Sequence, residues 1–268
     1  MRRAAVTMKE RVLNMENRIA RAFEKAGREN RGAFVAYLTM GYPAPAASEA
    51  AVDDLVAGGV DIVELGVPFS DPFADGGVIR SAAYEALRQG MTLDGVLSSA
   101  KRIRRRHPET GLVLFSYYNL LFSMGLEKFA DAAADAGIDA VLAVDLPLEE
   151  RGELLDAILP RGVGYVPLIA PNTPLERVKA SAEGLEGTFL YVITVKGVTG
   201  ARRELPADLL ERLDAIRGVS PLPIAAGFGI STRAQAEAVS AHADGFVVGS
   251  ALVRRLGAEG SLKGGLLP

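Results

Sequence analysis

The stretch VDIVELGVPFSDPFADGG, residues 60–77, joins a short apolar run to a loop that carries acidic side chains. The run from Val60 to Leu65 is rich in β-branched residues and too short for a helix, so it predicts a strand buried on both faces. Glu64 lies near the carboxyl end of this strand. Because burying a carboxylate there is costly, its presence suggests a function. The loop that follows contains two prolines and several glycines, which is typical of turns.

Two further carboxylates, Asp71 and Asp75, stand on this loop. A carboxylate on a rigid strand end and a second one on a nearby loop form a candidate acid/base pair, because their surroundings can separate their pKa values. An ordinary structural interpretation stays open at this point. A Glu near a strand end can anchor a neighbouring loop, and an Asp before Pro or Gly is common in turns.

Units of the same kind recur along the chain from residue 33 to residue 256. The predicted strands are 33–39, 60–66, 111–117, 138–145, 163–169, 187–194, 221–227 and 243–249. The predicted helices are 1–31, 47–57, 79–89, 93–106, 126–136, 149–159, 174–183, 206–217, 231–241 and 250–256. Strands that are apolar throughout indicate a parallel sheet covered on both faces.

Eight strand–helix units predict a single (β/α)8 TIM barrel of the α/β class, with an extra N-terminal helix and extended βα loops. The whole chain, residues 1–268, is read as one domain, in which residues 1–14 form an N-terminal extension. An open, doubly wound sheet is the alternative, although such sheets more often use about five or six strands.

The composition narrows the class of protein. The chain has no cysteine and two histidines, His107 and His242, which excludes disulfides and argues against a metal site. A net charge of −3 argues against nucleic-acid binding. No apolar run approaches the roughly 20 residues of a membrane span, and the N-terminus lacks the apolar segment of a secretory signal. A cytoplasmic globular protein with no membrane partner is expected.

Glycine-rich turns follow the last three predicted strands. They read GVTGARR (197–203), AGFGIS (226–231) and DGFVVGSAL (244–252). Their backbone N–H groups, together with a final helix expected to be capped by Ser250, predict a phosphate site, which TIM barrels commonly place after strands 7 and 8. Taken singly, such glycines only shape tight turns.

Aromatic and apolar side chains at other strand ends are candidates for an apolar slot between the phosphate site and Glu64. They are Tyr37, Tyr117, Tyr191, Phe228, Leu142 and Ile169, of which Leu142 and Ile169 are more simply explained as barrel core.

From about Met15 to Leu256 the chain resembles the tryptophan synthase alpha chain family. The resemblance rests on AFVAYLTMGYP, VELGVPFSDPFADG, AVDLPLEE, GVTGARR, AGFGIS and VVGSAL, in this order. It implies a lyase that cleaves indole-3-glycerol phosphate to indole and glyceraldehyde 3-phosphate by a retro-aldol reaction, without a cofactor. It also implies a PLP-containing beta subunit as partner, in an α2β2 assembly, which receives indole through a tunnel.

The resemblance further implies roles for individual residues. Glu64 matches the general acid/base, Asp75 the carboxylate facing the indole N–H, and Thr199 the loop residue that positions Asp75. The matched phosphate cradle is Gly200, Gly229, Gly249 and Ser250, and the matched slot residues are Tyr37, Tyr191 and Phe228. Loops 66–77 and 195–203 match lids that close over substrate.

Some positions depart from the family pattern, namely Tyr42, Gly77-Val78, Arg80, Val195-Lys196 and His242. None of them replaces Glu64 or Asp75, so they bear on subunit coupling and loop dynamics more than on the chemistry.

Three alternatives to the function that the resemblance implies remain. Lys196 follows strand 6, where class I aldolases carry a Schiff-base lysine, although a solvated lysine is the simpler explanation. The second alternative is that the chain is a stand-alone indole-producing lyase. The third is that it is a non-catalytic subunit that activates the beta chain.

Overall fold

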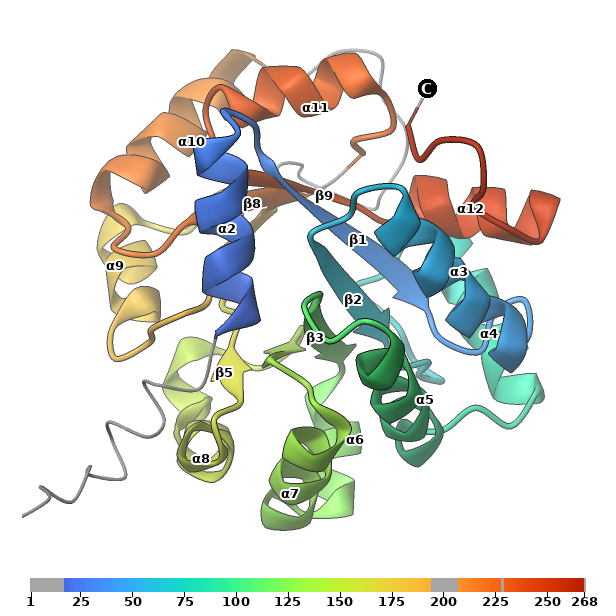
Figure 1. The fold of residues 1–268 in the computed structure, drawn as a ribbon. Coiled ribbons are helices and arrows are strands. Elements are labelled where there is room, and N and C mark those ends of the chain that lie inside the picture. The colour runs from blue at the N-terminus through green and yellow to red at the C-terminus, as the bar shows by residue number, and fades with distance from the viewer. Residues whose placement is uncertain (1–16, 194–206, 228, 268) are drawn as a thin grey trace, which may run out of the picture.

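A curled parallel sheet forms the centre of the molecule (Figure 1). The computed structural model describes residues 17–193, 207–227 and 229–267. Within these residues the sheet has nine strands in the order β5-β4-β3-β2-β1-β9-β8-β7-β6. The strands are β1 (Ala33–Thr39), β2 (Ile62–Gly66), β3 (Gly111–Ser116), β4 (Ala140–Ala143), β5 (Gly164–Tyr165), β6 (Leu168–Ile169), β7 (Leu190–Ile193), β8 (Ile224–Gly227) and β9 (Gly245–Val248).

The two ends of this sheet, β5 and β6, are halves of the single strand predicted at 163–169. The division falls at Pro167, which has no N–H to donate to a neighbouring strand. Before it, the N–H of Val166 donates to the carbonyl of Val141 at 2.9 Å, and after it the N–H of Tyr191 donates to the carbonyl of Pro167 at 2.9 Å. The segment therefore changes partner from β4 to β7, which closes the eight predicted units into a TIM-like barrel.

Helices surround the sheet, and Figure 1 shows them as an outer ring. They are α2 (Arg18–Arg28), α3 (Pro45–Ala57), α4 (Gly77–Arg88), α5 (Leu93–Arg106), α6 (Tyr118–Met124), α7 (Leu126–Ala136), α8 (Gly152–Ile158), α9 (Leu175–Ala182), α10 (Ala207–Val219), α11 (Arg233–Ser240) and α12 (Ser250–Glu259), with short 3-10 turns at Leu148–Glu150 and Leu159–Arg161. The predicted helices are confirmed within the described residues, and α6 is an addition. None of the helices in the described ranges is long and apolar enough to span a membrane.

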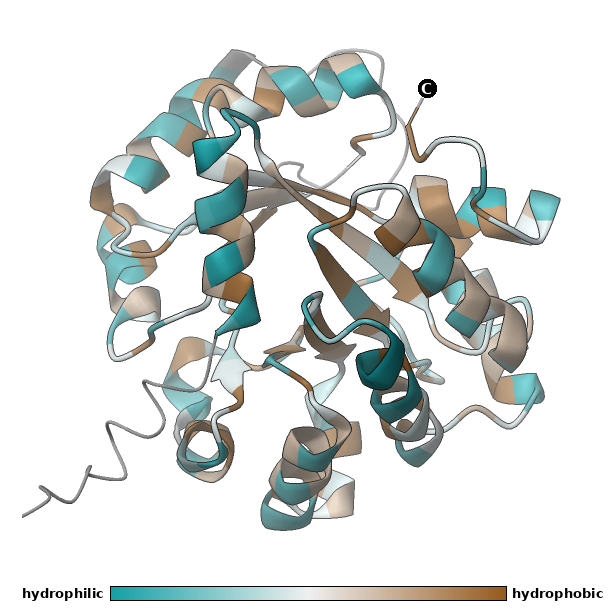
Figure 2. Ribbon diagram, in the orientation of Figure 1, coloured by the Kyte–Doolittle hydropathy of each residue, from teal (hydrophilic) through white to brown (hydrophobic). Residues whose placement is uncertain are grey.

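Each strand is buried on both faces, as the apolar runs predicted. One buried cluster fills the barrel and contains Val35, Ile62 and Val113, while alternating residues such as Val63 and Leu65 pack outward against the helices. Figure 2 shows the same division, with apolar strands and the polar faces of the helices turned outward. Glu64 follows Ile62 at an interval of two, so it points into the barrel.

The N-terminal helix α2 closes one end of the barrel. Its side chains Ile19 and Phe23 belong to the interior cluster, and the ring of Phe23 lies 5.4 Å from that of Phe189. Asn17 caps the helix by accepting from the N–H of Ala20 at 3.1 Å. Because the amino ends of the strands are covered in this way, the cavity that remains opens at the carboxyl ends.

Three aspartates fix the amino ends of the strands. Asp61, Asp139 and Asp244 each stand just before a strand and accept from a backbone N–H at the start of the neighbouring strand. The donors are Phe34 at 2.8 Å, Leu112 at 2.8 Å and Ile224 at 2.9 Å. The same kind of side-chain hydrogen bond thus sets the register of three strand pairs, at the end of the barrel opposite the cavity.

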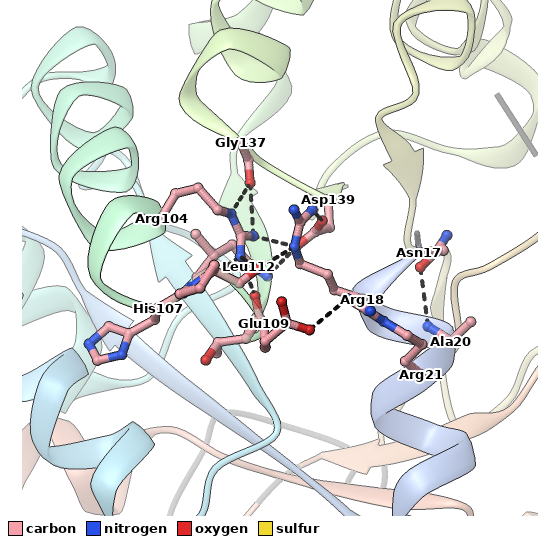
Figure 3. Close-up of polar contacts among 12 residues, drawn as sticks. Asn17, Arg18, Ala20, Arg21, Arg104, His107, Glu109, Leu112, Gly137 and Asp139 are labelled. Carbon is pink, nitrogen blue, oxygen red and sulfur yellow. Dashed lines mark hydrogen bonds and ion pairs between the residues drawn. The ribbon is translucent and has the colours of Figure 1, made fainter. Parts of the chain in front are cut away.

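Asp139 is the centre of the polar cluster drawn in Figure 3. It accepts from Arg18 of α2 at 3.0 Å and from Arg104 of α5 at 2.6 Å. Arg104 also donates to the carbonyl of Gly137 at 2.9 Å. Only 8% of the Asp139 side chain and 13% of the Arg104 side chain are exposed, so this is a largely desolvated ion pair. The cluster joins the N-terminal helix to the barrel.

Asp139→Ala is expected to lower the free energy of unfolding by about 3 kcal/mol, because it leaves a buried guanidinium and a strand N–H without their carboxylate. Asp131→Ala is the control: its carboxylate pairs with Arg161 but is 70% exposed, so the expected loss is below about 1 kcal/mol. Urea unfolding of both variants measures the difference. Equal losses would contradict a structural role for the Asp139 cluster.

Candidate active site

A cavity of about 250 Å³ lies at the carboxyl ends of the strands. Its walls include Glu64, Asp75, Tyr37, Tyr191, Gly229, Gly249 and Ser250, which were predicted from the sequence to form the site. Residues from β1, β2, β7 and β9 thus meet the loop after β2 and the start of α12 in one space. The described ranges contain no cluster of three or more His, Asp or Glu side chains suited to a metal ion.

Glu64 is completely buried on β2 and faces this cavity. Neither of its carboxylate oxygens has a hydrogen-bond partner among the described residues. Burial raises the pKa of Glu64 from its ordinary value of 4.5 to about 8, because desolvation penalises the charged form. At neutral pH this carboxyl is therefore mainly protonated and can donate a proton.

Asp75 lies on the loop between β2 and α4, as predicted, and is half-buried there. Partial burial raises the pKa of Asp75 to about 6, against the lowering effects of a hydrogen bond from Tyr117 and the positive charge of Arg80. Asp75 is thus still ionised at pH 7. Arg80 is one of the departures from the family pattern, and it bears on this carboxylate electrostatically.

The side chain of Tyr117 holds the loop rather than lining the cavity. Its hydroxyl donates to Asp75 Oδ2 at 3.0 Å and accepts from the N–H of Ala74 at 3.1 Å. The rings of Phe69 and Phe73 lie 4.8 and 5.4 Å from its own ring. Tyr117 is therefore a positioning residue for Asp75.

Tyr37 and Tyr191 line the cavity and both pack their hydroxyls on strand-end glycines. A Cβ added to Gly66 would lie 2.3 Å from the Tyr37 hydroxyl oxygen, and a Cβ added to Gly227 would lie 2.3 Å from that of Tyr191. The edge of Tyr37 meets the ring of Phe115, with the centroids 5.1 Å apart. Glycine is needed at 66 and 227 because the rings occupy the space of a side chain.

Two helices, α11 and α12, begin near the predicted phosphate site, but their first turns differ. Gln235 of α11 accepts through Oε1 from the N–H groups of Ser231 at 2.9 Å and Thr232 at 3.2 Å, which forms a capping box with Thr232. The first turn of α12 has no side-chain cap. Backbone N–H groups at the start of α12 are therefore free to bind an anion.

Ser250 does not cap α12, contrary to the prediction. It is the first residue of the helix, and Gly249 occupies the cap position. A cap needs a side chain on the residue before the helix, and Gly249 has none. Ser250 and Gly249 nevertheless line the cavity, so this end of α12 faces the space that holds Glu64.

Comparisons with known proteins show the family of the chain. The family model described as "Tryptophan synthase alpha chain" matches residues 23–264. The tryptophan synthase alpha chain of Opitutus terrae is 45% identical over 237 residues, which cover 88% of this chain and 88% of that protein.

This chain belongs to the tryptophan synthase alpha chain family. Solved structures support the assignment. Tryptophan synthase from Mycobacterium tuberculosis has a TM-score of 0.81 at 36% identity, covering 89% of this chain and 91% of that chain. The a2b2 complex from Pyrococcus furiosus has a TM-score of 0.79 at 34% identity, covering 86% of this chain and 92% of that chain.

Several residues expected from the tryptophan synthase alpha chain pattern lie outside the described residues. They are Thr199, Gly200, Phe228 and the alternative Lys196, together with the whole segment 195–203 expected to act as a lid. Their predicted roles stay predictions.

The structure also adds cavity residues that the sequence did not single out. They include Val78, Ile79, Phe115, Leu168, Val247 and Arg254. Leu142 and Ile169 belong to the core, and the cavity is lined by Leu168 rather than its neighbour Ile169. The alternation of side chains along a strand predicts which residues share a face of that strand. It does not predict which of the two faces lines the cavity. For Arg254 a signal existed, since it follows Ser250 by four residues on a helix.

Tyr42, a departure from the tryptophan synthase alpha chain pattern, packs against α12. A Cβ added to Gly257 would lie 2.0 Å from its hydroxyl oxygen. The loop after β1 is thereby placed against the helix whose first residues line the cavity.

Proposed function

We propose that this protein cleaves indole-3-glycerol phosphate to indole and glyceraldehyde 3-phosphate by a retro-aldol reaction, as the alpha subunit of tryptophan synthase. The observation that carries the proposal is one cavity that holds a buried, protonated Glu64, an ionised Asp75 and an uncapped helix end. Membership of the tryptophan synthase alpha chain family supports the same reaction.

The reaction breaks the bond between C3 of the indole ring and C3′ of the side chain. Glu64 gives its proton to C3, which makes the ring a leaving group. The carboxylate thus formed accepts the proton of the C3′ hydroxyl as the bond breaks and the aldehyde forms, so Glu64 ends protonated. Asp75 stabilises the positive charge that develops on the N1–H group when C3 is protonated. The electron pair of the broken C3–C3′ bond then returns to the ring, so neutral indole forms with its N1 proton in place and Asp75 stays ionised. The chemistry needs no cofactor.

The substrate is expected to lie across the mouth of the barrel. Its phosphate binds at Gly229, Gly249 and Ser250, where free backbone N–H groups of α12 point. Tyr37 and Tyr191 flank the indole ring. Thr199, Gly200 and Phe228 complete the site in this proposal.

The expected partner is a tryptophan synthase beta subunit in an α2β2 assembly, as in the a2b2 complex of the Pyrococcus furiosus protein. Three large apolar side chains are exposed on the segments that follow β2 and β3, namely Phe73, Tyr84 and Phe122. The cytoplasm is the proposed compartment.

Indole release from indole-3-glycerol phosphate, measured with and without a beta subunit, tests the proposal. Weak activity that rises when the beta subunit is added supports a coupled alpha subunit. Strong activity without it would indicate a stand-alone lyase. No cleavage in either state would leave a non-catalytic subunit that activates the beta chain. Borohydride trapping of a covalent adduct would instead support the aldolase-type role of Lys196.

The pH dependence of kcat/KM follows from the two carboxyl pKa values. The acid limb is expected near pH 6, because protonation of Asp75 removes its charge below that value. The basic limb is expected near pH 8, because Glu64 loses its donatable proton above it. A bell-shaped profile measured in constant-ionic-strength buffers checks both limbs. A rate that keeps rising above pH 8.5 would rule out Glu64 as the initial proton donor.

A further inference from the structure

The guanidinium-bearing residue Arg254 lines the same cavity as Glu64 and Asp75. It is the one Lys or Arg among the described residues that form the cavity walls. Within the described ranges it makes no hydrogen bond or ion pair, and it is exposed at the mouth. A cation in the wall of a cavity, without a carboxylate partner, is available to a ligand.

The helix geometry directs this side chain toward the expected phosphate. Arg254 follows Ser250 by four residues on α12, so the two lie one turn apart on the same face. Long side chains on a helix lean toward its N-terminus. The guanidinium of Arg254 therefore extends toward the turn that contains Gly249 and Ser250, both of which line the cavity.

The neighbouring Arg255 shows the contrast. It donates to Glu259 Oε2 at 2.8 Å and to the carbonyl of Lys263 at 2.6 Å, and it also contacts the carbonyl of Gly265. These contacts hold it against the C-terminal segment, and it does not line the cavity. Two adjacent arginines thus have separate roles, one structural and one facing the cavity.

Electrostatics at this end of α12 favour an anion. The first turn contains no acidic residue, and its free N–H groups carry the positive end of the helix dipole. The charge of Arg254 adds to that positive end, an arrangement that is unfavourable until an anion binds. Backbone N–H groups alone can bind either the monoanion or the dianion of a phosphate. A guanidinium adds a counter-charge and charge-assisted hydrogen bonds.

We propose that Arg254 is a specificity residue that pairs with the phosphate dianion of the substrate and selects phosphorylated over unphosphorylated indole-glycerol substrates. This inference rests on the proposed function for the identity of the substrate. Arg254 touches the phosphate and not the reacting carbons, so it acts on substrate binding and leaves the proton transfers to Glu64 and Asp75.

The test compares Arg254→Gln with the matched control Arg255→Gln, which removes the same charge one residue along the helix. Loss of a charge-assisted contact is expected to raise KM for indole-3-glycerol phosphate about tenfold in Arg254→Gln, with kcat within about twofold of wild type. The preference for this substrate over unphosphorylated indole-3-glycerol is expected to fall by the same factor of about ten. Arg254→Lys keeps the charge and is expected to raise KM only about threefold.

An unchanged KM and preference in Arg254→Gln would overturn the inference, as would equal changes in Arg255→Gln. Titration with inorganic phosphate, followed by calorimetry, separates this outcome from failure of the proposed function. If the wild type does not cleave indole-3-glycerol phosphate, the proposed function fails. Weaker phosphate binding in Arg254→Gln than in Arg255→Gln would then still support the anion role, and equal binding would remove it.

Discussion

Glu64→Gln is expected to lower kcat for cleavage of indole-3-glycerol phosphate by about 1,000-fold, in the middle of the range for a single positioned acid/base group. Glutamine has nearly the same shape as the protonated carboxyl but cannot donate a proton to C3 or accept one from the C3′ hydroxyl. Since the side chain is completely buried, water has little access to replace it. Retention of more than a tenth of the wild-type kcat would contradict its role.

Relative to wild type, Glu64→Gln should gain stability at alkaline pH. A loss of kcat in this variant would therefore reflect lost proton transfer and not lost folding. The folded-state pKa of Glu64 is raised from 4.5 to about 8, so folding favours the protonated form. Its contribution is complete below about pH 4.5 and is lost as the pH rises toward 8. Relative to wild type, Glu64→Gln should gain about 4 kcal/mol between pH 4.5 and pH 8, because one pKa unit corresponds to about 1.4 kcal/mol.

Urea unfolding of both proteins at several pH values measures this gain. Asp75, whose pKa is also raised, is present in both proteins and cancels from the difference. A stability difference that does not change with pH would show that the carboxyl of Glu64 titrates normally, and the proposed proton donation would then need another source.

The barrel was predictable because its strands are apolar on both faces and its units repeat. What the sequence could not show was the division at Pro167, since it depends on which strand pairs with each half of the segment. Helix α6 was missed for a related reason. It is short, and its first N–H is bound by Asp145 from the next unit at 2.7 Å, a contact between segments 27 residues apart.

At the candidate site, the sequence located Glu64 and Asp75 but not their surroundings. The burial of Glu64 followed from its place in an apolar strand. That of Asp75 did not, because it arises from Tyr117 and the folding of the loop onto it. Ser250 was assigned as a cap on local pattern, but it is the first residue of the helix and Gly249 holds the cap position. Local signals therefore gave the residues, while packing between segments decided their protonation and exposure.

Asp75→Asn is expected to lower kcat by about 100-fold, since a group that must carry charge in the transition state becomes neutral. The loop should keep its position, because the Asn side-chain oxygen can still accept from the Tyr117 hydroxyl, which lies 3.0 Å from Asp75 Oδ2. Stopped-flow or steady-state assays of indole release measure the effect, and an unchanged circular dichroism spectrum confirms the fold.

Tyr117→Phe is the matched control, because it removes the hydrogen bond while leaving the carboxylate in place. This hydrogen bond lowers the pKa of Asp75, so the variant should shift the acid limb of the pH profile to a higher value than the wild-type limb near pH 6. Its kcat at pH 8 should fall by less than about tenfold, the loss of positioning alone. If Asp75→Asn and Tyr117→Phe lose the same activity at pH 8, then the position of the loop matters and the charge of Asp75 does not. A 100-fold loss confined to Asp75→Asn would instead assign to Asp75 the stabilisation of the charge that develops on the indole nitrogen.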